Sequence, residues 1–144
     1  MEFVISLGQI HPILEWIRDQ LKNMYFDPAQ LHRIELASEE ALVNILNHAY
    51  QGRSEKVEIQ VKTFSTQYAE IAFIDTGPSF NPLHVKAVDP NLPLEQRQIG
   101  GLGIHLMRNC IDEIQYARVG KKNILKFIIL KKAIGSSFKA QSFE

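Results

Sequence analysis

One short stretch limits the folds open to this chain more than any other feature. From residue 57 to 62 (VEIQVK), apolar side chains alternate with charged or polar ones without exception. Strict alternation is typical of a β-strand with one face packed and the other in water. A sheet built from such strands carries its helices on one face only, so we expect a half-covered sheet.

The remaining chain divides into helical and extended segments around this strand. Helical spacing of apolar residues predicts helices over residues 9–24, 29–50 and 102–112. The second of these has a start signal, with Asp27 at the cap and Pro28 in the first turn. Further strands are expected over residues 2–7, 69–75, 113–119 and 123–131, with hairpin turns near residues 65–67 and 120–123.

Length and composition indicate one small globular domain. The chain has 144 residues, 45% hydrophobic and 22% charged, and its formal net charge is zero. This balance argues against broad nucleic-acid binding, which needs a basic field. The single cysteine, Cys110, allows no disulfide within the chain. With neither a secretion signal nor an apolar run of membrane-spanning length in the sequence, we expect a soluble, cytoplasmic protein without membrane contact.

A long irregular segment separates the strand at 69–75 from the next helix. Residues 76–99 contain four prolines and show no regular apolar pattern. Loops of this length are usually functional lids or disordered segments. We expect the domain to cover residues 1–134 and the last residues, 135–144, to form a flexible tail.

The helix over residues 29–50 carries the first candidate site residues. Glu40, Asn44 and Asn47 share one side, within an arc of about 60°, opposite an apolar stripe. Two interpretations are open here. The polar side is an ordinary solvated face, or Asn44 supplies an oxygen ligand to Mg²⁺ while Glu40 activates a hydroxyl or water. His48 is either a packed residue or part of the same cleft.

The second candidate group lies at the end of the apolar strand, in Asp75-Thr76-Gly77. A strand that ends in a common Asp-Gly type of turn would explain it. A binding site would explain it equally. In that case the Asp75 carboxylate accepts a hydrogen bond from the exocyclic amine of adenine, and Gly77 lets the backbone approach the base.

The third group is glycine-rich and precedes the last helix, with Gly100, Gly101, Leu102 and Gly103 in sequence. It is either a hinge or a turn whose amides, with the helix N-terminus, receive phosphate oxygens. It is no Walker A loop, because the chain lacks G-x-x-x-x-G-K-[ST]. It is also a poor dinucleotide-binding fingerprint, because a loop precedes it and its third glycine is missing.

In order and spacing, these three groups resemble the N, G1 and G2 boxes of the GHKL ATPases. The segments around Ser38–Asn44 and His48–Tyr50, together with Asp112-Glu113 and Asn123-x-Leu125, resemble the anti-sigma factor serine kinase branch in particular. The resemblance covers roughly residues 1–132. It implies the Bergerat ATP-binding fold, a two-layer α/β (α+β) sandwich whose mixed, mainly antiparallel sheet has helices on one face.

Carried over to this sequence, the resemblance implies a role for each candidate. Glu40 would be the catalytic base and Asn44 the magnesium ligand, beside Asn47 and His48 in the ATP site. Asp75 would bind adenine with support from Gly77. The phosphates would lie under a lid made from residues 78–99, near Arg97 and residues 100–103 (GGLG).

The resemblance further implies a serine kinase of bacterial partner switching. Such a protein binds Mg-ATP, phosphorylates an anti-anti-sigma (STAS-domain) protein and silences a sigma factor; a homodimer is left open. One departure keeps an alternative alive, because residues 124–126 (ILK) stand where better-known kinases have a threonine. The alternative is an inactive, nucleotide-dependent module that sequesters a regulatory partner. In a third interpretation, the chain is a plain interaction domain and the motifs are accidental.

Overall fold

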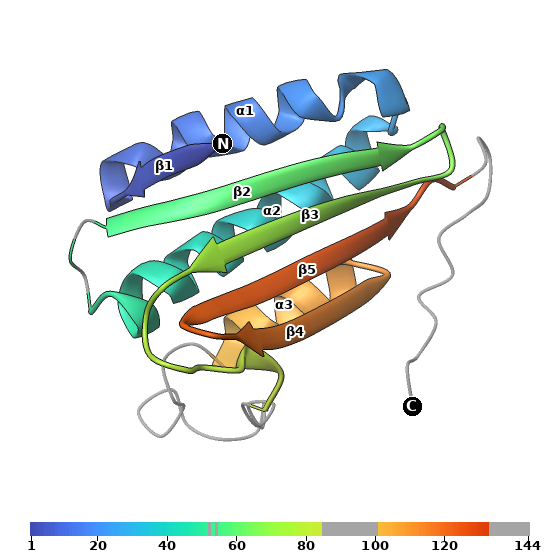
Figure 1. Cartoon of the computed structure of the whole chain (residues 1–144). Coiled ribbons are helices and arrows are strands. Elements are labelled where there is room, and N and C mark those ends of the chain that lie inside the picture. Colours follow the sequence, from blue (N-terminus) through green and yellow to red (C-terminus); the bar gives the residue numbers. More distant parts are fainter. Residues whose placement is uncertain (52, 54, 85–100, 133–144) are drawn as a thin grey trace.

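Within the part of the chain that the structure describes, five strands and three α-helices form the framework (Figure 1). The computed structural model describes residues 1–51, 53, 55–84 and 101–132, and of residues 101–103 it describes the backbone only. The strands are β1 (Glu2–Ile5), β2 (Glu55–Phe64), β3 (Tyr68–Asp75), β4 (Glu113–Val119) and β5 (Lys122–Leu130). The helices are α1 (Ile10–Gln20), α2 (Pro28–Asn44) and α3 (Gly101–Cys110).

The strands form one sheet in the order β1-β2-β3-β5-β4. Each neighbouring pair within it is antiparallel. The helices lie on one side of this sheet, with α2 between α1 and α3 (Figure 1). The predicted two-layer fold is therefore confirmed, and the sheet is antiparallel throughout the described pairings.

The core lies between the helices and the inner face of the sheet. The alternation in β2 places Val57 and Ile59 inside, where both are fully buried. At the centre, Phe73 of β3 and Phe127 of β5 are also fully buried and meet edge to face, with ring centroids 5.1 Å apart. Burial of these large side chains supplies the main driving force that holds the helices on this face.

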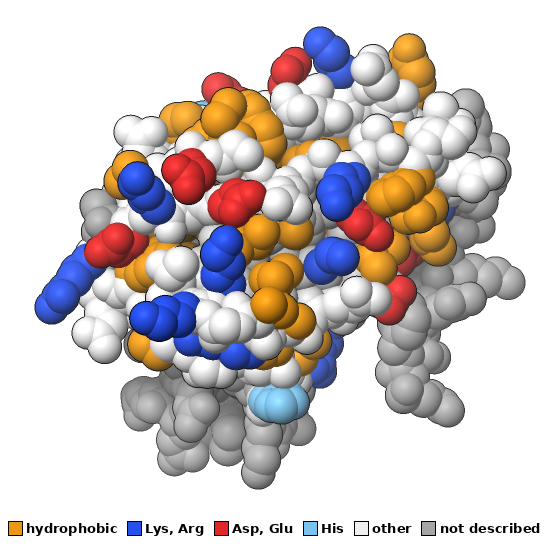
Figure 2. All heavy atoms as spheres, viewed as in Figure 1, with side chains coloured by type: hydrophobic (Ala, Val, Ile, Leu, Met, Phe, Trp, Pro, Cys, Tyr) orange, Lys and Arg blue, Asp and Glu red, His pale blue; other side chains and the backbone are white. Residues whose placement is uncertain are grey.

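The outer face of the sheet has no helix over it among the described residues. Figure 2 shows this face, where lysine and glutamate side chains are interspersed with apolar ones. Glu70 of β3 and Lys126 of β5 form an ion pair here, with their charged atoms 3.9 Å apart. This wet outer face is the one that the alternation of residues 57–62 predicted.

Several predicted helix limits differ from the observed ones. The helix predicted over residues 9–24 is α-helical only from Ile10 to Gln20, with 3₁₀ turns on either side. Helix α2 begins as predicted, because the Asp27 side chain accepts a hydrogen bond of 2.7 Å from the Gln30 amide. It continues beyond Asn44 as a π-helical turn, Ile45–Ala49.

No helix within the described part of the chain is both long and apolar enough to span a membrane.

Candidate functional site

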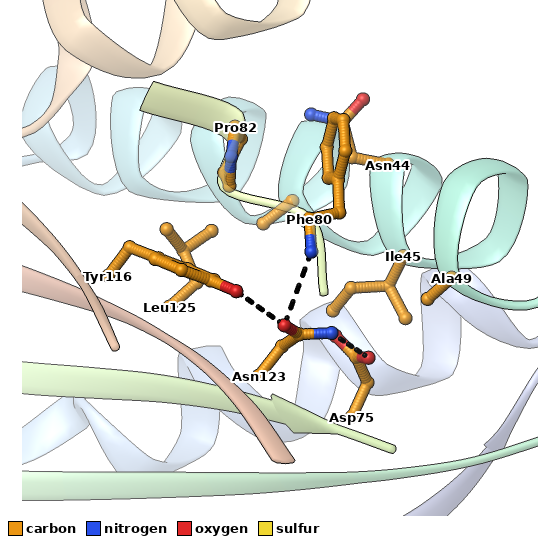
Figure 3. Close-up of a pocket in the computed structure, with 10 residues that line it drawn as sticks. Asn44, Ile45, Ala49, Asp75, Phe80, Pro82, Tyr116, Asn123 and Leu125 are labelled. Carbon is orange, nitrogen blue, oxygen red and sulfur yellow. Dashed lines mark hydrogen bonds between the residues drawn. The ribbon is translucent and has the colours of Figure 1, made fainter. Parts of the chain in front are cut away.

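A pocket lies between α2 and the inner face of the sheet, where β3 ends and β5 begins (Figure 3). Its free volume is about 20 Å³, which is room for about one water molecule. Two predicted site residues, Asn44 and Asp75, meet here from distant parts of the sequence. The lining consists of Ala41, Asn44, Ile45, Ala49, Asp75, Phe80, Pro82, Tyr116, Asn123 and Leu125.

Asp75 is the only acidic side chain that lines this pocket among the described residues. It is the last residue of β3 and 6% exposed. Its Oδ1 accepts hydrogen bonds of 2.9 Å from the Gly77 amide and 2.9 Å from Asn123 Nδ2. Its Oδ2 has no hydrogen-bond partner among the described residues, so it remains an acceptor for a ligand that enters the pocket.

Asn123 and Tyr116 are pocket residues to which the sequence analysis assigned no role. Asn123 is 4% exposed and directly opposite Asp75 in the β3–β5 register. Its Oδ1 accepts a hydrogen bond of 2.5 Å from the Tyr116 hydroxyl (Figure 3). A signal existed, because the hairpin turn predicted near residues 120–123 places the start of the last strand, where Asn123 stands, at the sheet end where Asp75 lies.

Gly77 is required by protein packing, whatever its role toward a base. An added Cβ would lie 2.5 Å from the Ala49 Cβ and 2.7 Å from the Ala49 carbonyl oxygen. The turn after β3 therefore touches the end of the π-helical segment, and only glycine permits this approach. Its neighbour Thr76 is held too, because the Thr76 amide donates to the Tyr50 hydroxyl at 3.0 Å.

The π-helical turn separates the polar residues that a regular α-helix would keep together. Asn44 is 8% exposed and lines the pocket, and its buried Nδ2 has no hydrogen-bond partner among the residues that the structure describes. Asn47 and His48 are exposed and outside the pocket lining. The wider π turn changes the angle between successive residues, and the Tyr50 amide accordingly donates to the Ile45 carbonyl, five residues back, at 3.2 Å.

Phe80 closes the pocket from the side of the predicted lid. Its ring stacks on that of His48, with centroids 4.6 Å apart and planes inclined by 15°. Pro82, at the start of a short 3₁₀ turn, lines the pocket beside it. Since the free volume is only about 20 Å³, a group as large as a purine base would fit only if this segment moved.

Glu40 is half-buried on α2, one turn before Asn44 and outside the pocket lining. Burial raises the pKa of its carboxyl above the ordinary value of 4.5, and the neighbouring Glu39 carboxylate raises it further. A raised pKa makes the carboxylate a stronger base, which suits a group that takes a proton from a hydroxyl.

The third predicted group is described only in part. Gly101, Leu102 and Gly103 form the first turn of α3, whose N-terminal end lies at the same end of the molecule as the end of β3 (Figure 1). Arg97, Gly100 and most of the predicted lid lie outside the described residues, as does the predicted tail at residues 135–144.

A family model described as histidine kinase-like ATPase domain matches residues 3–129. The chain belongs to this family. Among its relatives is the serine-protein kinase RsbW of Bacillus mycoides, 31% identical over 97 residues, which make up 65% of this chain and 60% of the relative. RsbW of Bacillus licheniformis is 29% identical over 115 residues, or 76% of this chain and 69% of the relative. The chain thus spans less than two thirds of the first relative's length.

Solved structures of other histidine kinase-like ATPase domains share the fold. The catalytic domain of histidine kinase ThkA superposes with a TM-score of 0.55 over 91% of this chain and 95% of its own, at 16% identity. Acinetobacter baumannii histidine kinase AdeS superposes with a TM-score of 0.51 over 92% of this chain and 68% of its own, at 18% identity. At such identities the likeness concerns the fold alone.

Proposed function

We propose that this chain binds Mg-ATP in the pocket between α2 and the sheet and transfers the γ-phosphate to a serine of an anti-anti-sigma (STAS-domain) protein. In the same proposal it also binds and silences a sigma factor. The observation that carries the proposal is the state of Asp75. One carboxylate oxygen is fixed by two N–H donors and the other is without a partner among the described residues, at a pocket shared with Asn44.

The base of the nucleotide fits the Asp75 end of the pocket by its chemistry. Adenine carries an exocyclic amine, which donates hydrogen bonds, and Asp75 Oδ2 accepts them. The apolar side chains of Ile45 and Leu125 line the same space and suit the faces of a purine ring. Phe80 has to leave this space when the base enters.

The metal and phosphates fit the Asn44 end. The buried Asn44 Nδ2, an N–H donor, lacks a hydrogen-bond partner among the described residues, and a phosphate oxygen would satisfy it while Asn44 Oδ1 faces the metal. The described residues contain no group of three or more His, Cys, Asp or Glu side chains that could hold a metal ion. The proposed Mg²⁺ would therefore take an oxygen from Asn44 and others from phosphates and water, as this ion commonly does. The first turn of α3, with Gly101 and Gly103, would supply amides to the phosphates.

Glu40 is the proposed catalytic base. When bound, Mg-ATP would supply the γ-phosphoryl group, which passes to the serine oxygen as its bond to the β-phosphate breaks and ADP leaves, and Mg²⁺ would offset the negative charge of the phosphates. Glu40 takes the proton from the attacking serine hydroxyl. Because burial and Glu39 raise its pKa, the carboxylate holds that proton more firmly than an ordinary glutamate would.

The test is a phosphorylation assay with labelled ATP, magnesium and candidate STAS-domain proteins. Glu40→Gln keeps the size and the helix, so it should bind ATP within about threefold of the parent while phosphorylation falls roughly 10²–10⁴-fold. Glu39→Gln is the matched control, because Glu39 is the exposed neighbour, and it should retain most activity. Asn44→Ala should lose ATP affinity mainly when magnesium is present.

The outcomes separate kinase from binding module. If the parent binds ATP and a regulatory partner but transfers no phosphate to any candidate, the chain is a nucleotide-dependent module that sequesters its partner. If the parent phosphorylates a partner and Glu40→Gln keeps the parent rate, the kinase stands and the assignment of the base is wrong. A parent that binds no ATP refutes the whole proposal.

A further inference from the structure

Asn123 is a buried polar residue that contacts Asp75 but has no part of its own in the proposed phosphoryl transfer. It is 4% exposed and faces Asp75 across the β3–β5 register. We propose that Asn123, held in place by Tyr116, sets the base selectivity of the pocket by fixing the Asp75 carboxylate as a pure acceptor. This inference rests on the proposed nucleotide binding and assigns Asn123 and Tyr116 a positioning role within it.

The surroundings of Asn123 allow its amide one orientation. The Asn123 Oδ1 accepts from the Tyr116 hydroxyl at 2.5 Å and from the Phe80 amide at 3.4 Å. The Nδ2 donates to Asp75 Oδ1 at 2.9 Å and to the Pro78 carbonyl at 2.9 Å, and lies 3.3 Å from the Gly77 carbonyl. A flipped amide would place its oxygen against these three acceptors, so the N–H side is held toward Asp75.

This orientation determines how Asp75 meets a ligand. Two N–H groups, from Gly77 and Asn123, saturate Oδ1 and hold the carboxylate plane, which leaves Oδ2 as the acceptor without a partner among the described residues. Such an oxygen attracts an amine and repels a carbonyl oxygen at the same position. Without Asn123, the carboxyl would keep only the amide of Gly77, two residues away in its own turn, and could rotate about its side-chain bonds. Base selectivity therefore depends on Asp75 and Asn123 together and not on Asp75 alone.

Tyr116 extends the arrangement to the edge strand. Tyr116 lines the pocket from β4, and its hydroxyl, which donates to Asn123 Oδ1 and lies 3.5 Å from Ser79 Oγ, influences Asp75 through Asn123. Removal of this hydroxyl leaves the pocket lining otherwise intact. Tyr116→Phe would loosen the Asn123 amide without removing it. We therefore expect a smaller change in base selectivity, in the same direction as the change caused by loss of Asn123.

The experiment compares ATP with ITP, which differ in an amine or a carbonyl oxygen at the 6-position of the purine. Calorimetry would measure both affinities for the parent, Asn123→Ala, Tyr116→Phe and the matched control Asn109→Ala, whose asparagine is exposed on α3. The parent should bind ATP at least about tenfold more tightly than ITP. In Asn123→Ala, ATP affinity should fall to within about threefold of ITP affinity, while ITP affinity stays within about threefold of the parent value.

Tyr116→Phe should reduce the ATP-to-ITP ratio by a smaller factor, and Asn109→Ala should keep the parent ratio. An equal loss of affinity for both nucleotides would overturn the inference, because a general packing defect weakens both alike. A ratio that stays at the parent value in Asn123→Ala and Tyr116→Phe, or a parent without preference, would overturn it too. If Asn123→Ala fails to fold, the ATP-to-ITP affinity ratio of Tyr116→Phe tests the inference in its place. A parent that binds neither nucleotide refutes the proposed function itself, which distinguishes the two failures.

Discussion

Gly77→Ala is the substitution whose effect follows most directly from the geometry of the site. An added Cβ would lie 2.5 Å from the Cβ of Ala49, 2.7 Å from its carbonyl oxygen and 2.8 Å from its Cα. Carbon atoms pack at about 3.5–4.0 Å, so either the turn after β3 or the end of the π-helical segment must move by about 1 Å. Two of these three contacts are with backbone atoms, and no flexible side chain can yield.

Two losses follow from this displacement. Overpacking of a well-packed site typically costs about 1–3 kcal/mol, which for a chain of this size lowers Tm by about 2–12 °C. The shift also moves the Gly77 amide and carbonyl, which bond Asp75 Oδ1 at 2.9 Å and Arg118 at 2.7 Å. A displacement of about 1 Å takes such bonds beyond useful length, so ATP affinity should fall about tenfold or more.

Thermal unfolding followed by circular dichroism and calorimetric titration with Mg-ATP would measure both effects. Gly8→Ala is the matched control, because an added Cβ at Gly8 has no atom of the described residues within 4 Å. It should leave both quantities near the parent values. If Gly77→Ala matched this control in Tm and in ATP affinity, the close approach to Ala49 would not be the reason for glycine at this position.

Two further substitutions test the environment of Glu40 and the closure of the pocket. Burial and Glu39 raise the pKa of Glu40 above 4.5, so the charged carboxylate is disfavoured in the folded protein. The folded protein therefore keeps its full stability below about pH 4, where Glu40 is protonated, and loses part of it as the pH rises through the raised pKa. Glu40→Gln should therefore melt above the parent at pH 7 and at the parent temperature near pH 4; a constant difference across this range would contradict the assigned cause. Phe80→Ala should bind ATP about two- to tenfold more tightly, because the closed conformation loses its stack on His48 and competes less with the base. Weaker binding by calorimetry would show that Phe80 holds the nucleotide rather than excluding it.

Much of the framework could be predicted from local pattern. The alternation at residues 57–62 predicted the inner and outer faces of β2, and the Asp27-Pro28 signal predicted the start of α2. Both depend on interactions within a few residues, such as side-chain periodicity and the cap on the Gln30 amide. The same holds for Asp75, which ends an apolar strand and was predicted as a site residue; the structure places it at the pocket.

Three features of the site were decided by the tertiary structure. The separation of Asn44 from Asn47 depends on the π-helical turn, and a prediction made for a regular α-helix, at 100° per residue, does not include such a turn. The need for glycine at residue 77 depends on where Ala49 comes to lie. The hydrogen bond from Asn123 to Asp75 joins residues 48 positions apart.

The physical reason is the same in each case. Propensity, capping and periodicity act over one or two turns of chain, and they appear directly in the sequence. Which residues meet across a sheet depends on strand register, and a shift of one residue would send Asn123 to the outer face. Register and close packing are set by the whole core at once, in which Phe73 and Phe127 fix how β3 lies against β5. The sequence by itself therefore determined the elements and the position of Asp75 at the end of β3, while the tertiary structure decided which neighbours hold its carboxylate in place.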